Sequence, residues 1–295
     1  MPEMIRITSG TLSAAINSFG AELTHLEDGE GRELMTDADP AFWTGHAPLL
    51  FPIVGALNGG RYRLEDGRSF AMAQHGFARR SEWVVAEHGV DHARFQLADD
   101  EVTREQYPFG FVLDAEYRLD GMRLEVTVRL RNRGEEALPA SFGFHPAFAW
   151  PLPYGEPREN HRVTFAADEE PHVNRVVDAL IGARDRPSPL DGRELLLRDE
   201  LFAEDALVWE RVESASVLYG AAQGPVLDIA FPGATSLGIW TRPGARYVCV
   251  EPWWGHADPE GFAGTIWEKP GIIRLDPGDE RTFAMSVTLV KGNGS

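Results

Sequence analysis

Glu251 has the residue type and the neighbours that acid–base chemistry needs. It lies in the segment Val248-Cys-Val-Glu-Pro-Trp-Trp-Gly255, and strand alternation places it on the same face as Cys249. A carboxylate at the end of a strand can act as a general base, and Trp253 or Trp254 can provide the flat apolar surface on which the C–H faces of a sugar pack. The alternative interpretation is a carboxylate at the rim of the sheet, paired with a nearby arginine.

His145 stands in the aromatic segment Phe142-Gly-Phe-His-Pro-Ala-Phe148. These neighbours predict a buried or half-buried side chain, where the pKa of the imidazole falls and the neutral ring is favoured. A histidine of this kind can exchange protons in a site. It can equally be a hydrogen-bonded histidine of the core, and the segment by itself leaves both interpretations open.

Two further segments carry ionisable side chains next to apolar ones. Gln74-His-Gly-Phe-Ala-Arg79 places His75 beside a glycine and four residues before Arg79. His75 is either a functional group or a histidine of an ordinary loop. In Glu204-Asp-Ala-Leu207, Asp205 alone is indistinguishable from a turn residue.

Several other kinds of site are not supported by the spacing of residues. The sequence has no His-x-His, His-Glu-x-x-His or Cys-x-x-Cys pattern, so we predict no metal site. It also has no Gly-x-Ser-x-Gly elbow and no glycine-rich loop of either phosphate-binding type. Nucleophilic hydrolysis and nucleotide binding are therefore not expected.

Composition limits the partners of the chain and its surroundings. The 28 Lys and Arg against 46 Asp and Glu give a formal net charge of −18, which repels nucleic acid and anionic membranes. A single cysteine, Cys249, excludes an intrachain disulfide. The chain shows neither a secretory signal pattern nor an apolar run of about 18 residues. We expect a cytoplasmic protein that binds no nucleic acid and no membrane.

The elements that must position these residues are mostly strands. Met122-Arg-Leu-Glu-Val-Thr-Val-Arg-Leu130 alternates apolar and polar residues, and Asp120-Gly121 links it to the strand pattern of Phe111–Leu119, which predicts a tight hairpin. Only short helices are expected, at Asp100 to Gln106 and Arg198 to Ala203. We predict an all-β fold, a large antiparallel sandwich formed by one domain over residues 1–295.

The candidate segments, taken in order, resemble the aldose 1-epimerase (galactose mutarotase-like) superfamily, and more closely its LacX-like branch and the related hexose-6-phosphate mutarotases. The resemblance runs over nearly the whole chain, and each motif is short. The matching segments are Ser18-Phe-Gly-Ala-Glu-Leu23, Ala47-Pro-Leu-Leu-Phe-Pro-Ile-Val-Gly55, Gln74-His-Gly-Phe-Ala-Arg79, Phe144-His-Pro146, Asp205-Ala-Leu207, Val250-Glu-Pro252, Lys269-Pro-Gly-Ile and Leu275-Asp-Pro-Gly-Asp279.

This resemblance implies a β-supersandwich whose concave sheet binds a pyranose. Glu251 matches the family's general base and His145 its general acid. His75 and Asp205 match residues that contact the sugar, and Arg79 matches an arginine of the branch. Where galactose mutarotases carry Asn-Arg-Ile, this chain has Gly55-Ala56-Leu57, which argues against galactose as the main substrate.

The implied function is interconversion of the anomers of a free aldose, an isomerase reaction. Its chemistry needs one base and one acid, and a carboxylate with a reference pKa of about 4.3 and an imidazole near 6.5 suit these roles. No redox step occurs, so no cofactor is expected. We predict that His75, His145, Asp205 and Glu251 meet in one open, mostly polar pocket that is floored by a β-sheet and walled by at least one of Trp253 and Trp254.

Two other functions remain open at this point. A hexose-6-phosphate 1-epimerase would use the same acid–base pair and clamp phosphate with Arg79 and a second arginine, Arg61 or Arg80. A non-catalytic carbohydrate-binding module would keep the pocket without the reaction. In each case the partner is a small sugar, and the protein is expected to be a monomer or a homodimer.

Overall fold

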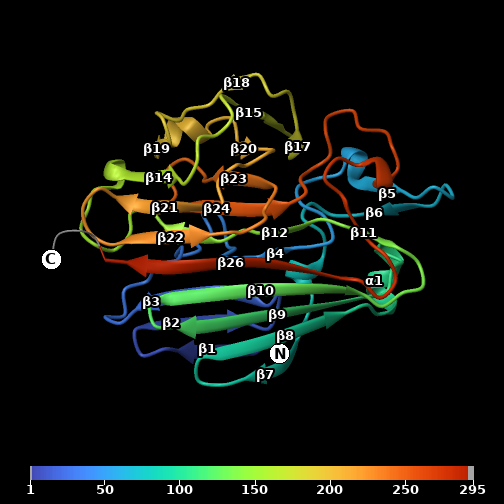
Figure 1. Cartoon of the computed structure of the whole chain (residues 1–295), viewed down its shortest axis with the longest axis horizontal. Helices are drawn as coiled ribbons and strands as arrows, with labels where there is room; N and C mark the ends of the chain where they lie inside the picture. The colour runs from blue at the N-terminus through green and yellow to red at the C-terminus, as the bar shows by residue number, and fades with distance from the viewer. Residues whose placement is uncertain (1, 292–295) are drawn as a thin grey trace.

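The computed structural model describes residues 2–291 and confirms the predicted all-β fold. All the strand ladders in this range are antiparallel, and Figure 1 shows β22, β26, β10, β9 and β8 side by side. The largest sheet has nine strands. In spatial order they are β19 (Glu194–Leu196), β14 (His161–Phe165), β21 (Ser216–Ala221), β22 (Val226–Ala230), β26 (Glu280–Val290), β10 (Arg123–Asn132), β9 (Phe111–Asp120), β8 (His92–Ala98) and β7 (Val84–His88).

A six-stranded sheet carries the candidate residues. Its strands are β20 (Leu207–Trp209), β23 (Ser236–Trp240), β24 (Tyr247–Trp254), β12 (Phe142–Phe144) and β4 (Leu49–Leu50), with β13 (Ala147–Ala149) also paired to β24. Smaller sheets complete the fold. They are β1 (Met4–Thr8), β2 (Leu12–Asn17) and β3 (Glu22–Asp28), and the pairs β5 (Arg61–Arg63) with β6 (Ser69–Ala71), β11 (Leu138–Ala140) with β25 (Ile273–Leu275), β15 (His172–Val173) with β18 (Arg186–Pro187), and β16 (Val176–Val177) with β17 (Leu180–Ile181).

Helices are few and short, as the sequence predicts. Asp100 accepts a hydrogen bond from the backbone N–H of Thr103, and this cap starts the α-helix α1 (Glu101–Gln106). The segment expected at Arg198 to Ala203 forms a 3₁₀ turn instead of an α-helix. The 3₁₀ turns are η1 (Asn58–Gly60), η2 (Ala78–Arg80), η3 (Arg158–Asn160), η4 (Asp199–Phe202) and η5 (Ile266–Glu268).

Alternation along the strands builds the core between the two large sheets. In β10 the residues alternate between buried and more exposed positions, and the predicted hairpin pairs Leu124 with Leu119. Phe142 of β12 stacks on Phe283 of β26 with ring centroids 4.5 Å apart, and Trp254 of β24 lies 5.2 Å from the same ring. One face of the six-stranded sheet therefore packs on the nine-stranded sheet, and its other face is left for the site.

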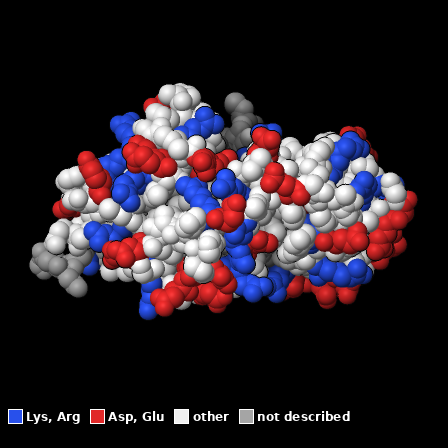
Figure 2. All heavy atoms as spheres, turned by 90° about the horizontal axis from the view of Figure 1, so that it is seen from above, with Lys and Arg blue, Asp and Glu red and all other residues white. Residues whose placement is uncertain are grey.

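Acidic and basic side chains are interleaved over the face seen in Figure 2, so the net negative charge is spread out and not gathered in one block there. Between residues 2 and 291, no helix has both the length and the apolar character that a membrane crossing requires.

Candidate active site

The centre of the site is the outer face of β24. Val248, Val250 and Trp254 point into the core, so alternation sends Glu251 and Trp253 to the opposite face. A Cβ added at Gly143 or at Gly238, which flank β24 on its two sides, would stand 2.7 Å and 2.6 Å from the ring of Trp253. The two glycines therefore leave the space in which the indole lies flat on the sheet and forms a floor.

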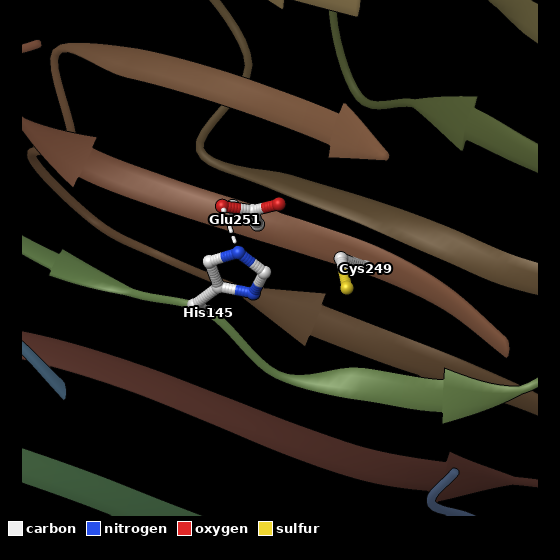
Figure 3. Close-up of side chains that lie close together, drawn as sticks. All are labelled: His145, Cys249 and Glu251. Atoms are coloured by element: carbon white, nitrogen blue, oxygen red, sulfur yellow. Dashed lines mark ion pairs between the residues drawn. The ribbon is translucent and has the colours of Figure 1, made fainter. Parts of the chain in front are cut away.

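His145 and Glu251 are in direct contact on this face. His145 follows β12, and β13 begins two residues later; both strands pair with β24, which fixes the histidine beside it. Its Nε2 lies 3.2 Å from Oε2 of Glu251, and Figure 3 shows the two side chains pointing toward one another. The imidazole packs between Trp43 and Trp240, with ring centroids 5.0 and 5.9 Å away. Strand pairing and aromatic packing thus hold the acid–base pair together.

Burial shifts the pKa values of His145 and Glu251 in opposite directions. The side chains of His145 and Glu251 are 9% and 3% exposed. Burial, with the nearby Asp205 carboxylate, raises the pKa of Glu251 well above its usual value. Burial lowers the pKa of His145 to about 3. In the free protein the pair is therefore uncharged, with a protonated Glu251 facing a neutral imidazole, and it holds one proton that either group can carry.

His75 joins the pair from the loop after β6. Its backbone has a φ of 66°, the left-handed region that residues other than glycine rarely adopt. The backbone N–H of Gly55 donates to its Nδ1 at 3.1 Å, so a neutral ring carries its proton on Nε2. Burial, together with the neighbouring His145, lowers the pKa of His75 well below its usual value. His75 therefore presents a neutral imidazole, 5.6 Å from the ring of His145.

Asp205 and Arg79 bring opposite charges to the rim. Asp205 also adopts a left-handed backbone, with a φ of 82°, and its Oδ1 accepts the N–H of Ala206 at 2.8 Å. Arg79 donates from Nη2 to the carbonyl of Gln74 at 2.9 Å. Backbone strain of this kind concentrates at functional positions. Of the described residues other than glycine with a positive φ, His75, Ala179 and Asp205 line this cavity, whereas Ala21, Ala38 and Asp178 do not, so half of these strained backbones lie at one pocket.

The side chains described above line a cavity of about 490 Å³. His75, Arg79, His145, Asp205, Glu251 and Trp253 all line it, so the structure brings together every predicted site residue except Trp254. Trp254 is 2% exposed and packs on Phe142 and Phe283, because it follows Trp253 on the strand and must point to the opposite face. The expectation that Trp254 could line the pocket is corrected. The expectation of a mostly polar pocket is corrected too, because hydrocarbon side chains such as Val54, Ile181 and Val208 also line the cavity.

Sequence reasoning missed Trp43, Trp240 and Arg242, which also line the cavity. Trp240 pairs with Cys249 across the β23–β24 ladder, so the face of the sheet on which Trp240 lies depends on the register of that ladder. No single segment of the sequence reveals this register. Trp43 comes from a loop and had no signal beyond its type. Of the arginines considered for a phosphate clamp, Arg79 lines the cavity, but neither candidate for the second arginine does: Arg61 donates to Ser69, and Arg80 borders a separate hollow next to α1.

Cys249 adds a third potential ligand atom beside the pair. Its sulfur, one nitrogen of His145 and one carboxylate oxygen of Glu251 lie within 4.8 Å of one another (Figure 3). Burial raises the pKa of the Cys249 thiol well above its usual value, and the carboxylate of Glu251 acts in the same direction. Metal binding needs the thiolate, so this environment opposes it. The geometry alone would admit a metal, but the chemistry of the donor atoms does not favour one.

Comparisons with known proteins identify the family to which the chain belongs. The sequence model of the aldose 1-epimerase family matches residues 3–287. The chromosomal protein LacX of Lactococcus lactis subsp. lactis is 28% identical over 296 residues, which cover 97% of this chain and 99% of that protein. A galactose mutarotase related enzyme from Lactobacillus acidophilus superposes with a TM-score of 0.90 at 30% identity, covering 99% of both chains. A galactose mutarotase-like protein from Lactobacillus casei gives 0.90 at 26% identity, covering 98% of this chain and all of that one. The chain therefore belongs to the aldose 1-epimerase family, in its LacX-like branch.

Proposed function

We propose that this protein interconverts the α and β anomers of a free aldose by opening and reclosing the pyranose ring. The observation that carries the proposal is the contact of 3.2 Å between His145 Nε2 and Glu251 Oε2 inside a cavity large enough for a sugar. The ring oxygen and the anomeric hydroxyl are bonded to the same carbon, C1. Two adjacent atoms that exchange protons can therefore reach both oxygens at once, one accepting a proton and the other donating one.

The productive form of the pair carries its proton on the histidine. From the uncharged resting form, Glu251 passes its proton to Nε2 of His145 across their hydrogen bond. The Glu251 carboxylate then accepts the proton of the C1 hydroxyl, the bond between C1 and the ring oxygen breaks, and His145 protonates the ring oxygen. The open aldehyde is left with a neutral imidazole and a protonated Glu251.

Reclosure is the same sequence in reverse. After rotation about the C1–C2 bond, His145 removes the proton from the C5 hydroxyl while this oxygen attacks the other face of C1, and Glu251 protonates the carbonyl oxygen. The pair ends with its starting charges, so the chemistry needs no redox step, no cofactor and no outside proton. His75, Asp205 and Arg79 can bind the remaining hydroxyls, and Trp253 can support the C–H face.

Mutarotation rates test this proposal. Polarimetry or NMR on glucose, galactose and their 6-phosphates, corrected for the spontaneous rate, should show acceleration of a free sugar. Glu251→Gln keeps the shape of the side chain but removes the basic oxygen, so the catalysed rate should fall by about 10²–10⁴-fold. His145→Asn should lose a comparable factor, and the double variant less than the product, because the two groups act as one unit.

The controls and the alternatives are part of the same experiment. Circular dichroism and a sugar titration must show that each variant is folded and still binds. Acceleration confined to the 6-phosphates would replace the proposal by hexose-6-phosphate epimerisation. If folded Glu251→Gln stays within a few-fold of the parent on its best sugar, the acid–base mechanism is wrong, and a carbohydrate-binding module explains the pocket better.

A further inference from the structure

Lys269 and Asp258 form a buried ion pair that the proposed mechanism does not use. Lys269 opens Lys269-Pro-Gly-Ile, one of the segments that resemble the family, and neither member of the pair lines the cavity. Nζ of Lys269 lies 3.0 Å from Oδ1 of Asp258, and the two side chains are 0% and 4% exposed. Taking both charges out of water is costly, so the pair is weak evidence for stability and raises the question of what it holds in place.

The pair anchors the segment that follows β24. Nζ of Lys269 donates to the carbonyl of His256 at 2.6 Å, and Asp258 lies two residues further on. Burial lowers the pKa of Lys269, and the charge of Asp258 opposes this shift. Ala257, between the two anchored residues, lines the cavity. The ion pair therefore lies directly behind one part of the cavity.

Asp258 connects this anchor to the segment after β4. Its Oδ2 accepts the backbone N–H of Asn58 at 2.9 Å, and its own N–H donates to the carbonyl of Ala56 at 3.0 Å. Gly55, the residue before, has a φ of 66°, and a Cβ added there would stand 2.4 Å from Cβ of Ala257. The backbone at Gly55 is thus tied to Asp258 and packed against Ala257.

Gly55 in turn holds His75. The backbone N–H of His75 donates to the carbonyl of Gly55 at 2.8 Å, and the N–H of Gly55 donates to Nδ1 of the ring at 3.1 Å. With Nδ1 accepting, the neutral ring carries its proton on Nε2; without the Gly55 N–H, the proton can lie on Nδ1 instead. The exposed amide of Gln74, 3.2 Å from Nε2, can turn either its oxygen or its nitrogen to the ring, so it does not select a tautomer.

We propose that Lys269 and Asp258 are positioning residues, which hold Gly55 against His75 and so keep the tautomer of His75 that donates from Nε2 to a sugar oxygen. The inference rests on the proposed function, because it takes His75 as a contact of the sugar. Side chains of a site keep their geometry only where surrounding residues lock them in place. Loss of the pair should therefore weaken sugar binding more than proton transfer, which belongs to His145 and Glu251.

Lys269→Met combined with Asp258→Ala tests the inference. This double variant removes the ion pair and the acceptor of the Asn58 N–H but leaves no buried charge without a partner, so we expect it to fold. In protein labelled with ¹⁵N-histidine, two-bond ¹H–¹⁵N NMR distinguishes the tautomers, and the signals lost in His75→Gly identify His75. We expect the Nε2-protonated form in the parent and a mixture in the double variant. In saturation kinetics, kcat/KM should fall about tenfold, mainly through KM.

Two comparisons show whether the effect passes through His75. Glycine adopts the left-handed backbone of this position without the ring, so in a His75→Gly background the double variant should have little further effect on kcat/KM. Arg32→Met with Asp28→Asn is the matched control. It removes another ion pair whose aspartate is 4% exposed, and neither residue lines the cavity, so the His75 tautomer and kcat/KM should not change.

A milder variant covers the case in which the first does not fold. Lys269→Met with Asp258→Asn keeps the shape of the aspartate and an acceptor for the Asn58 N–H, so it should shift the His75 tautomer in the same direction but less. Circular dichroism must show that each variant compared is folded.

The outcomes separate this inference from the proposed function. If a folded variant of the pair keeps the parental His75 tautomer, or if kcat/KM falls equally with and without the His75 ring, the positioning role is overturned while the mutarotase function stands. The tautomer is measured without sugar. If it shifts as expected but the parent protein turns over no sugar, the positioning of His75 stands and the proposed function fails.

Discussion

Gly238→Ala tests whether the flat position of Trp253 matters for the site. Gly238 has an ordinary backbone conformation for an L-residue, so alanine causes no strain of its own there. The added Cβ would stand 2.6 Å from two atoms of the Trp253 ring, whereas carbon atoms in contact prefer about 3.5–4.0 Å. The indole must therefore move by about 1 Å, away from the sheet and into the cavity.

The magnitude follows from this displacement. Overpacking by one methyl group costs about 1–3 kcal/mol, which for a domain of this size lowers Tm by several degrees. A misplacement of about 1 Å in a site can cost up to 10²-fold in rate. We expect kcat/KM for mutarotation to fall by about 10–100-fold, mainly through a higher KM, because Trp253 supports the sugar and takes no part in proton transfer.

A double-mutant cycle isolates the cause. In a Trp253→Leu background the ring is absent, so Gly238→Ala should have little further effect on kcat/KM. Gly29→Ala is the matched control: it is exposed, and the nearest atom would stand 3.4 Å away, so activity should not change. The reasoning is refuted if Gly238→Ala lowers kcat/KM equally in both backgrounds, or if it keeps full activity in the presence of Trp253.

Four further predictions follow from the site and the core. Arg79→Ala should raise KM more than it lowers kcat in saturation kinetics, because a fixed cation orients oxygens but transfers no proton; the opposite pattern would give Arg79 a role in tuning the acid–base pair. Burial lowers the pKa of His145 to about 3 and raises that of Glu251, so the pair keeps its single proton across neutral pH. We therefore expect kcat/KM to vary less than about threefold from pH 5 to 8. A pH profile of kcat/KM that rises or falls near about 6.5, the pKa of a free imidazole, would contradict this. His161 is buried, both of its ring nitrogens are hydrogen-bonded, and its pKa is lowered. Below about pH 6.5 the unfolded chain therefore binds a proton that the folded chain resists, so the free energy of unfolding, measured with urea, should decrease by up to about 1.4 kcal/mol for each unit by which the pH falls. His161→Gln should remove this part of the pH dependence. Dialysis against a chelator should leave kcat unchanged because Cys249 is held as a thiol, and a loss of activity that zinc restores would assign a metal to His145, Cys249 and Glu251.

The strands were predictable from the sequence because their signals are local. The hairpin of β9 and β10 follows from alternation and from Asp120-Gly121, and Gly121 does adopt a positive φ of 55°. The faces of Val248, Val250 and Glu251 follow from the same period of two. These features need only neighbouring residues, so one sequence is enough to find them.

The arrangement across strands was not predictable in this way. That Gly143 and Gly238 flank Trp253 depends on two ladders of β24, one with the preceding strand β23 and one with β12, more than ninety residues earlier in the chain, and the register of these ladders has no local signature. Which of Trp253 and Trp254 lines the pocket was predictable, by contrast, because Trp253 lies two residues after Glu251 and therefore on the same face of the strand. Trp43 reaches the site from a loop, whose path sequence periodicity does not describe.

The left-handed backbones of His75 and Asp205 also carry a consequence for protein engineering. Each such residue destabilises the fold by an amount of order 1–3 kcal/mol, and glycine at the same position would relieve it. Selection for thermal resistance alone will therefore favour loss of these two side chains. Screens for more thermostable variants of this protein need to score turnover in parallel, since two of the positions where glycine would raise the melting temperature lie in the cavity itself.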